Sequence, residues 1–403
     1  METFDAIVLG NGLAGAAISY ELAGRGLSVL LIDGRPPGDA PSATRYSYGV
    51  VTYWAGGNDL TRPLWEAGLT KQRQLPEELG ADTQFREMDF LLTIPPEFDR
   101  VAIQAEYQAL GARPEWLTPR QAQALEPLLN PQAIGAALLL RQGHVSPPHL
   151  IRAYNQAFQR LGGSHLVATV TDLVRVKHRV TGVLTAVQAY PARQVVLAAG
   201  ACSRPLLRSL GVVLPLYHTQ AELIETGPSS LTLRTQVMAA VNQRVALEAQ
   251  ASQPHQQPLW DRPDQEVVPP ILDSAAIQFQ DGHFCLGQIS RTLTSLDSPV
   301  SARDQQQSDR RLRAALAALL PEVATLPGTW HRCLVSFTAD GLPLVGALPT
   351  LAGLSLFTGF TAPFVLVPPL AQRLAEALVD GADPGLAALQ PGRFPLANSL
   401  PGC

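Results

Sequence analysis

The chain has 403 residues, and its 30 Lys+Arg against 34 Asp+Glu give a formal net charge of −4. Only 16% of the residues are charged and 46% are hydrophobic, while 32 Gly and 34 Pro indicate many turns rather than long helices. At roughly 100–200 residues per domain, this length allows about two or three domains. Because no run of Lys or Arg provides an electrostatic surface for nucleic acid or anionic lipid, we expect neither as a partner.

The cysteines and the N-terminal sequence favour a reducing, cytoplasmic location. The four cysteines are too few and too scattered for a disulfide framework or a CxxC metal site: Cys202, Cys285, Cys333 and Cys403. No basic region or cleavage motif of a secretory signal accompanies the first apolar run. The apolar stretch 351–370 contains Gly and Pro residues that interrupt the roughly 20 apolar residues needed to cross a bilayer, so no membrane span is expected.

The first 33 residues predict a strand, a helix and a second strand. Residues 4–9 (FDAIVL) are an apolar run that ends at Gly10, and residues 13–22 place apolar side chains on one helical face. Residues 28–32 (SVLLI) form a second apolar run, which stops at Asp33. A strand, helix and strand in this order form a βαβ unit, which implies a parallel sheet.

From residue 36 to residue 198 the sequence predicts a long loop followed by helices and short strands. Residues 36–57 are rich in Gly, Pro, Ser and Tyr, and long loops in compact domains usually serve a site. A strand is expected over 88–94, and helices are expected over 64–79, 119–125 and 147–161, the last with Ser146 as its N-cap. Short β-patterned runs follow at 166–170, 173–176, 183–187 and 194–198.

The remaining sequence changes character. Residues 216–300 alternate strand-like segments with a Gln- and Pro-rich loop (250–270), which indicates a second domain built on antiparallel strands. A helix is expected over 308–320, strands over 330–337 and 354–357, and a final amphipathic helix from about 368 to 379. The tail from residue 384 is expected to be irregular.

The turn after the first strand carries the motif Gly10-x-Gly12-x-x-Gly15. Gly10 allows a tight turn, Gly12 lets the backbone approach a pyrophosphate, and Gly15 lets the helix pack close to the strand. The helix N-terminus then directs free N–H groups at the phosphates, and Asp33 can accept hydrogen bonds from a ribose. Because strand, helix, second strand and terminal acid are in register, we expect a dinucleotide site rather than a glycine-rich turn without a ligand.

Three further segments resemble one flavoenzyme family. A second strand and small-residue turn, VVLAAGACS, occupies 195–203, and GHVSPPHLIRAYNQAFQRLGG at 143–163 is similar to a helical segment of the family. The run DGLPLVGALPTLAGLSLFTGF (340–360) resembles the flavin-contacting segment of the D-amino-acid oxidase, glycine oxidase and sarcosine oxidase family. This resemblance covers nearly the whole chain and implies FAD as the cofactor. It also implies an α/β fold in which a Rossmann-like FAD-binding domain is interleaved with an α+β substrate domain built on an antiparallel sheet.

The resemblance divides the chain between two domains, each of which the chain visits more than once. The FAD-binding domain would comprise residues 1–85, 143–215 and 330–390. The substrate domain would comprise residues 86–142 and 216–329, and residues 391–403 would form a C-terminal tail.

The resemblance also implies which residues contact FAD. The residues expected around the ADP part are Gly10, Gly12, Gly15, Asp33, Arg35 near the phosphates and, through its backbone, Val170. Thr44 and Arg45 match a pair that lines the isoalloxazine in sarcosine-oxidase-like members. The other expected contacts adjoin these motifs: Asn11, Leu13, Ala14, Gly34, Ala199, Gly200, Gly341, Gly359, Phe360 and Thr361. We expect the last helix to direct its N-terminal dipole at the flavin N1–C2=O group, which becomes anionic on reduction.

Cys333 matches a further feature of the family. In CLVSFTAD it lies seven residues before Asp340, the spacing at which sarcosine-oxidase-type enzymes bond a Cys to the flavin 8α carbon. A covalent FAD link at Cys333 is therefore one prediction. The alternative is a buried Cys that acts as a small apolar residue.

The chain departs from the family where other members hold a substrate carboxylate. Val335 and Tyr48 stand where glycine-oxidase-like and sarcosine-oxidase-like members have Arg, and the uncharged segment 361–369 replaces a loop with a Lys. Cys285 stands where sarcosine-oxidase-type enzymes have the Lys that helps O2 react. These departures do not touch FAD binding. They argue against a substrate that carries a carboxylate and against the oxidase half-reaction, and the electron acceptor stays open between O2 and another molecule.

Six polar residues are candidates for catalytic or substrate-binding groups that face the flavin: Arg45, Tyr53, Tyr217, His218, Arg291 and Arg332. A lone His or Tyr is more often a structural residue with satisfied hydrogen bonds, so both interpretations stay open. An uncharged segment at the flavin suits a neutral amine, a proline-like ring or a bulky hydrophobic amino acid in a water-poor pocket.

These observations favour an FAD-dependent oxidoreductase that oxidises a C–N bond of a small-molecule amine or amino acid by hydride transfer to flavin N5, giving an imine. An NAD(P)H-dependent flavin hydroxylase shares the N-terminal motif, but its later flavin segment would begin with Gly-Asp rather than ADGLP. The third hypothesis is a non-catalytic flavin-containing assembly or regulatory protein that has lost its substrate clamps. The sequence gives no oligomeric state.

Overall fold

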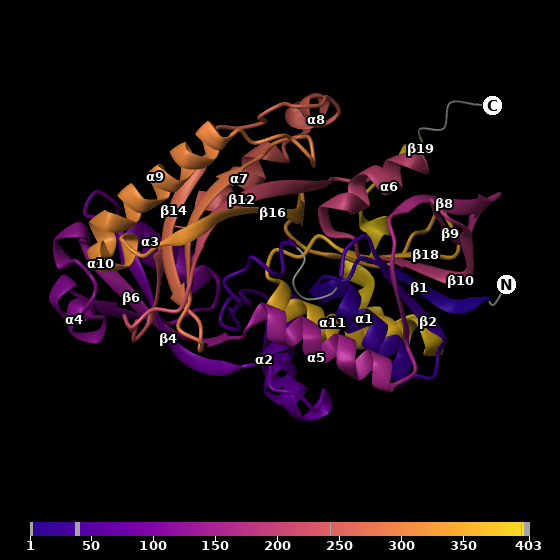
Figure 1. The fold of residues 1–403 in the computed structure, drawn as a ribbon, viewed down its shortest axis with the longest axis horizontal. Coiled ribbons are helices and arrows are strands. Elements are labelled where there is room, and N and C mark those ends of the chain that lie inside the picture. Colours follow the sequence, from indigo (N-terminus) through magenta and orange to yellow (C-terminus); the bar gives the residue numbers. More distant parts are fainter. Residues whose placement is uncertain (1–2, 37–40, 242, 396, 399–403) are drawn as a thin grey trace.

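The structure is a computed structural model that describes residues 3–36, 41–241, 243–395 and 397–398. It contains two large sheets at opposite ends of the molecule, with helices packed against both (Figure 1). The first sheet is mostly parallel and the second is mostly antiparallel. This arrangement confirms the expected fold class.

The central strands β1, β2 and β18 of the first sheet are apolar and mostly buried, as in parallel sheets of α/β proteins. The strand order of this sheet is β17-β18-β10-β1-β2-β7, and β9 joins β10 to the hairpin partner β8. All neighbours along this order are parallel except β17 and β18. The strands are β1 (Phe4–Leu9), β2 (Val29–Asp33), β7 (Ser164–Val167), β8 (Val170–Val176), β9 (Arg179–Thr185), β10 (Ala189–Leu197), β17 (Leu344–Ala347) and β18 (Leu354–Thr358).

Four helices form the main core with this sheet: α1 (Leu13–Gly24), α2 (Thr61–Glu78), α5 (Pro147–Arg160) and α11 (Pro363–Asp380). Ile18, Phe158 and Phe364 are fully buried where they meet. Leu207 and Leu210 pack against the other face of the sheet. Leu207 lies in α6 (Ser203–Ser209) and Leu210 directly follows it. The short elements in this region are η2 (Gly200–Cys202), α6, β11 (Val212–Val213) and its partner β19 (Ala397–Asn398).

The second sheet has the strand order β16-β12-β15-β14-β13-β4-β6-β3, with β5 beside β6. Its strands are antiparallel to their neighbours except for the parallel pair β13–β4. They are β3 (Val50–Val51), β4 (Arg86–Ile94), β5 (Glu115–Leu117), β6 (Ala136–His144), β12 (Leu216–Thr226), β13 (Gln236–Ala239), β14 (Ile271–Gln278), β15 (Phe284–Arg291) and β16 (Gly328–Thr338).

Side chains alternate between the two faces of the second sheet. On the outer face Leu91 and Ile224 belong to a core that includes α9 (Ala302–Leu319), α10 (Pro321–Ala324), α4 (Pro119–Leu125) and η1 (Pro131–Ala133). On the inner face Leu92 and Leu223 point toward the middle of the molecule. The helices beside the inner face are α3 (Arg100–Ala109), α7 (Gln243–Ala251) and α8 (Gln257–Trp260).

Helix α11 begins at Pro363 rather than near residue 368, so most of the uncharged segment 361–369 is helical rather than a loop. A proline suits the first helical position because its missing N–H has no acceptor there. Inside the helix, Pro368 leaves the Phe364 carbonyl without its usual donor, and the buried Gln72 amide of α2 donates to that oxygen at 2.5 Å. The neighbouring helix therefore replaces the hydrogen bond that the proline removes.

Two segments that were expected to be irregular contain short helices. The loop 250–270 includes η3 (Pro254–Gln256) and α8, and the tail includes η4 (Pro384–Leu389) and η5 (Pro391–Arg393). Each of these elements has a proline in its first two positions, where proline is favourable. Parts of the loop 36–57 and of the tail 391–403 lie outside the described residues. Ser146 precedes α5 as predicted, but its hydroxyl contacts His149 Nδ1 at 2.8 Å rather than a backbone N–H.

The domain boundaries stay a prediction, and the sheets depart from them at two points. β3 and most of β16 fall in the ranges 1–85 and 330–390, which were assigned to the FAD-binding domain, yet both strands pair within the second sheet. β16 pairs with β12 along its whole length, so the antiparallel sheet extends beyond the expected boundary at residue 329.

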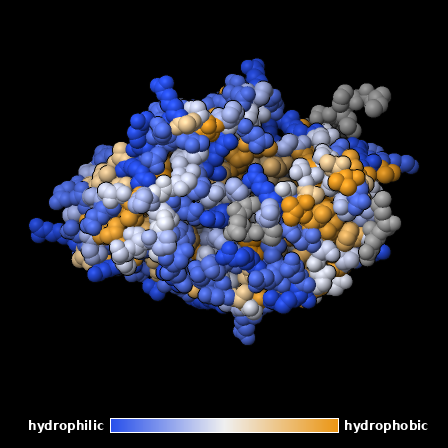
Figure 2. All heavy atoms as spheres, viewed as in Figure 1, coloured by the Kyte–Doolittle hydropathy of each residue, from blue (hydrophilic) through white to orange (hydrophobic). Residues whose placement is uncertain are grey.

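Hydrophilic side chains dominate the face of the molecule drawn in Figure 2, and apolar residues form separate groups between them. Large exposed apolar side chains include Val101 and Val187. Single apolar residues of this kind are normal on protein surfaces. No helix in the described part of the chain is long and apolar enough to cross a membrane.

Candidate active site

A cavity of about 2080 Å³ lies between the two sheets. Pockets for drug-sized ligands hold roughly 300–1,000 Å³, so this one has room for a dinucleotide and a second small molecule. Its glycine end is lined by residues 9–14, 32–36 and 198–202, at the carboxyl ends of β1, β2 and β10. Its Arg244 end is lined by residues 243–250 of α7, together with Tyr48, Asp273 and Cys333.

The turn between β1 and α1 forms the glycine end. Gly10 has a φ of +99°, and a Cβ on Gly15 would lie 1.6 Å from the Gly10 carbonyl oxygen, so both positions need glycine. Helix α1 has no side-chain cap at Gly12, and the Leu13 N–H donates to Thr44 Oγ1 at 3.1 Å. The other N–H groups of the first turn have no intrahelical acceptor, which suits them to bind a phosphate.

Asp33 holds this turn in shape. Its carboxylate accepts hydrogen bonds from the backbone N–H groups of Asn11 at 2.6 Å and Arg35 at 2.9 Å. Asn11 also exchanges side-chain hydrogen bonds with Asn155 of α5, at 2.9 and 3.0 Å. A carboxylate has about four acceptor sites, so Asp33 retains acceptors for ribose hydroxyls.

At the other end of the cavity, Arg244 is fixed by one carboxylate. Its Nε donates to Glu248 Oε1 at 2.8 Å, and the Thr219 hydroxyl donates to the same oxygen at 2.8 Å. Neither Nη atom of Arg244 has a hydrogen-bond partner among the described residues. Burial opposes the charge of Arg244, but the Glu248 carboxylate outweighs this effect and raises the pKa of the guanidinium. Arg244 is therefore a charged and oriented group that keeps donors for a ligand.

Two further polar atoms at the Arg244 end lack partners in the part of the chain that the structure describes, Tyr48 Oη and Asp273 Oδ1. Burial raises the pKa of Tyr48 well above its usual value and raises the pKa of Asp273 to about 6. Buried polar groups are normally hydrogen-bonded. Three such groups in one place, from a loop, a helix and a strand, indicate that this end of the cavity receives a polar ligand.

Residues 5–377 match the family described as FAD dependent oxidoreductase (DAO). The chain belongs to this family. FAD is its cofactor, which agrees with the prediction from the glycine motif.

Glycine oxidases match along nearly the whole chain, and another relative matches about half of it. A glycine oxidase from Pseudomonas aeruginosa is 25% identical over 398 residues, which cover 94% of this chain and 95% of that enzyme. A 4-methylaminobutanoate oxidase (formaldehyde-forming) from Paenarthrobacter nicotinovorans is 31% identical over 221 residues, or 53% of this chain, and the match spans only 26% of that enzyme. The crystal structure of glycine oxidase from Geobacillus kaustophilus has the same fold, with a TM-score of 0.78 at 22% identity over 98% of this chain and all of that one.

The glycine end fits FAD because it combines a glycine-only turn, open helix N–H groups and a carboxylate at the end of β2. The backbone of Gly12 and Ala14 would hold the pyrophosphate, and Asp33 would bind the ribose. Residues 360–364, which lead into α11 and include its first turn, line the same cavity, where a helix N-terminus favours negative charge.

Most of the residues predicted from the sequence line the cavity. These are Gly10, Asn11, Gly12, Leu13, Ala14, Asp33, Gly34, Arg35, Thr44, Val170, Ala199, Gly200, Arg332, Cys333, Gly359, Phe360 and Thr361. Gly15 and Gly341 do not line it. Gly15 packs on Gly10, and the Gly341 carbonyl accepts a hydrogen bond from the Thr361 hydroxyl at 3.4 Å. The contact of each predicted residue with FAD stays a prediction.

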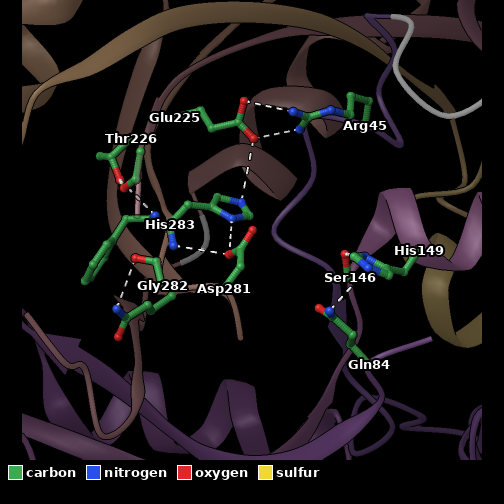
Figure 3. A network of polar contacts seen from close by, with 12 residues as sticks. Arg45, Gln84, Ser146, His149, Glu225, Thr226, Asp281, Gly282 and His283 are labelled. Atoms are coloured by element: carbon green, nitrogen blue, oxygen red, sulfur yellow. Dashed lines mark hydrogen bonds and ion pairs between the residues drawn. The ribbon is translucent and has the colours of Figure 1, made fainter. Parts of the chain in front are cut away.

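Arg45 is held by an ion pair rather than on the cavity wall. Its guanidinium binds both carboxylate oxygens of Glu225, at 2.7 and 3.0 Å, and Figure 3 shows this pair above His283. His283 and His331 lie 3.7 and 3.6 Å from the same carboxylate. Tyr46, which does line the cavity, stacks on His331 with ring centroids 4.3 Å apart. Arg45 is thus joined to the cavity wall through Glu225 and the stacked rings.

Three other predicted residues do not line the cavity and have contacts elsewhere. The Tyr53 hydroxyl donates to Glu87 at 3.4 Å, and the Tyr217 hydroxyl donates to Gln257 at 2.8 Å. His218 is 2% exposed, and burial lowers its pKa to about 4, so its ring is neutral at pH 7. The contacts of Tyr53 and Tyr217 agree with the structural interpretation of these two residues. Neither ring nitrogen of His218 has a hydrogen-bond partner among the described residues.

The two predicted arginines of the second sheet have protein partners. Arg291 forms ion pairs with Glu222 at 2.9 Å and Glu266 at 3.0 Å. Arg332 lines the cavity, but its Nη1 donates to Gln220 Oε1 at 3.3 Å and to a backbone carbonyl at 2.6 Å. Arg244 differs from both because its Nη atoms are left for a ligand.

Sequence reasoning did not find Arg244 or Asp273. An Arg followed four residues later by Glu, as at 244 and 248, is a common pair on an exposed helix. Only the contact between the buried Glu248 and Thr219 of the distant strand β12 shows that this pair lies inside the fold, at the cavity. The available signal was weak: a lone Arg–Glu pair in an amphipathic segment of the predicted substrate domain.

Proposed function

We propose that the protein oxidises a C–N bond of an amino acid or a related amine, and that Arg244 binds the substrate carboxylate. The observation that carries this proposal is the Arg244 guanidinium at the cavity wall, with both Nη atoms left without partners among the described residues. A guanidinium binds a carboxylate through two parallel hydrogen bonds. Arg244 would thus replace the family's arginines, whose positions are taken by Val335 and Tyr48.

FAD supplies a hydride acceptor at flavin N5 when it is bound. The chain's own residues orient the substrate for that transfer. Arg244 would fix the carboxylate, and the Tyr48 hydroxyl would donate to the same ligand. Val335 and Met238 line the same cavity and would keep water from the reacting carbon. Such positioning can supply much of the rate enhancement without a strong acid or base.

An apolar chamber adjoins the Arg244 end and supports a bulky substrate. Met238 packs with Tyr48 on one side and with the cluster of Phe90 and Trp54 on the other. Trp54, Phe90 and Leu92 all line the cavity. The two named relatives, glycine oxidase and 4-methylaminobutanoate oxidase, act by name on molecules with both an amine and a carboxylate. We therefore propose an amino acid with a large apolar side chain or N-substituent.

Anaerobic mixing of the FAD-loaded protein with matched pairs of compounds tests this proposal. Each pair contains an amino acid and the amine that lacks its carboxylate, such as phenylalanine and phenethylamine, or proline and pyrrolidine. We expect the amino acid to bleach the flavin roughly 10- to 100-fold faster than its partner, because only the amino acid reaches Arg244 with a carboxylate. Equal rates would overturn the role of Arg244, and no bleaching by any compound would favour the non-catalytic alternative. Re-oxidation in air then distinguishes O2 from another acceptor.

A covalent FAD link at Cys333 has its own test. The thiol lines the cavity, and burial raises its pKa to about 12, so it is protonated at neutral pH. Acid precipitation keeps a covalently bound flavin with the protein and releases a non-covalent one. Flavin in the supernatant of the wild-type protein excludes the link. Flavin that stays with the wild-type protein but is released from Cys333→Ser would support it.

A further inference from the structure

The proposed function leaves one carboxyl group beside Arg244 without a role. Asp273 lies at a β-bulge of β14, where Asp273 and Ser274 together oppose the single residue Gln288 of β15. A bulge turns side chains out of the regular alternation, and bulges are frequent next to active sites. Asp273 and Gln288 both line the cavity.

The surroundings of Asp273 leave one of its oxygens available. The backbone N–H groups of Gln243 and Arg244, at the start of α7, lie close to the carboxylate and favour its charged form. Oδ1 has no partner within the described residues. The charged or titratable groups that interact with this cluster are Arg244, Glu248, Tyr48, Cys285 and Cys333. Arg244 is the cation among them, and its ion pair is with Glu248 rather than with Asp273.

We propose that Asp273 binds the ammonium group of an α-amino-acid substrate and takes its proton before the substrate is oxidised. An α-amino acid carries its carboxylate and its ammonium on the same carbon. Arg244 and Asp273 are neighbours on the cavity wall and have opposite charges, so together they match both groups. This inference rests on the proposed function, and it narrows the substrate to a zwitterion whose amine arrives protonated.

The chemistry requires a proton acceptor because an ammonium nitrogen has no lone pair. The proton would pass from the substrate nitrogen to Asp273 Oδ1, which leaves a neutral amine and a neutral carboxylic acid. The C–H bond of the neutral amine would then break and its nitrogen lone pair would form the C=N bond of the iminium product; bound FAD would supply the acceptor for the hydride. Burial raises the pKa of Asp273 to about 6, which makes it a stronger base than an exposed carboxylate.

Asp273→Asn tests the role while keeping the side-chain shape and an acceptor for the α7 N–H groups. At pH 7 we expect the second-order rate constant for anaerobic flavin reduction by an amino acid to fall roughly 100-fold. Above the pKa of the substrate's amine, the substrate arrives neutral, and we expect the variant to come within about threefold of the wild type. The control is Asp89→Asn, an exposed residue of β4 paired with Arg141 at 3.1 Å, which should match the wild type at every pH.

The outcomes separate this inference from the proposed function. Normal reduction of wild-type FAD together with normal rates for Asp273→Asn overturns the role of Asp273 and leaves amino-acid oxidation intact. A variant that is slow at every pH indicates a structural role and also overturns it. No reduction of wild-type FAD by any amino acid overturns both proposals. If the variant does not retain FAD, the pH dependence of flavin reduction in the wild-type protein decides. The second-order rate constant must fall as the pH drops below about 6, and a rate constant that does not change from pH 5 to 8 overturns the proposal.

Discussion

The two ends of the cavity differ in how their polar groups are satisfied. At the glycine end, the Asp33 carboxylate and the Thr44 hydroxyl already accept hydrogen bonds from the backbone of the turn. At the Arg244 end, polar atoms of Arg244, Tyr48 and Asp273 have no partners among the described residues. Unpaired buried groups cost free energy, so a fold retains them where a ligand completes them. The difference indicates a prebuilt cofactor cradle at one end and, at the other, a site that its substrate completes.

Among the substitutions considered at the two ends of the cavity, removal of the Arg244 guanidinium should have the largest effect on activity. In Arg244→Met the substrate carboxylate loses its charged partner. We expect kcat/KM for amino acids to fall roughly 30- to 1,000-fold, which corresponds to a loss of about 2–4 kcal/mol of transition-state stabilisation. Flavin reduction by the matched amines without a carboxylate should change little. The control is Arg141→Met, which removes an exposed guanidinium. An unchanged kcat/KM for amino acids would show that the partnerless Nη atoms do not mark the substrate site.

The glycine end should respond through cofactor affinity instead. In Gly15→Ala the new methyl group would lie 1.6 Å from the Gly10 carbonyl oxygen, so α1 must move away from β1. We expect FAD to bind roughly 10- to 100-fold more weakly, since overpacking of this kind costs about 1–3 kcal/mol. Fluorescence titration of the flavin-free protein with FAD measures this. Gly24→Ala, in the same helix, is the control because its Cβ would approach Leu161 only to an ordinary 3.8 Å. An equal loss of FAD affinity in the two variants would mean that the effect comes from a general disturbance of helix α1 and not from the turn.

The same difference decides what the sequence could reveal. Gly10, Gly15 and Asp33 follow one another within a single βαβ unit, so local spacing was enough to predict the glycine end and the first sheet. Arg244 and Asp273 come from a helix and a strand of the second sheet region, and their proximity exists only in the folded chain. The extension of α11 to Pro363 was missed for the same reason, because the hydrogen bond that permits it comes from another helix.

Loss of the Thr44 hydroxyl should cost stability at the glycine end. Thr44→Val removes the acceptor of the Leu13 N–H and leaves this donor without a partner at the start of α1. Loss of an N-terminal helix cap costs about 1 kcal/mol, and we expect a similar drop in the free energy of unfolding. Urea unfolding at a fixed excess of FAD measures it. Thr70→Val is the control, because that hydroxyl bonds to a carbonyl of its own helix on the surface. A drop no larger than that of the control would contradict the view that the turn is already satisfied by the chain.

Loss of the Tyr48 hydroxyl, at the Arg244 end, should have the smallest effect on stability but should clearly raise KM for the substrate. The hydroxyl is buried without a partner in the described chain, so Tyr48→Phe removes a desolvated group and breaks no hydrogen bond. We expect the free energy of unfolding to stay within about 0.5 kcal/mol of the wild type or to rise, while KM for the amino acid increases several-fold. The same urea titration and steady-state kinetics measure both quantities. A loss of stability comparable to that of Thr44→Val would mean that the hydroxyl is satisfied within the fold. The two ends of the cavity would then be alike, and the absence of partners at Tyr48 would no longer point to the substrate.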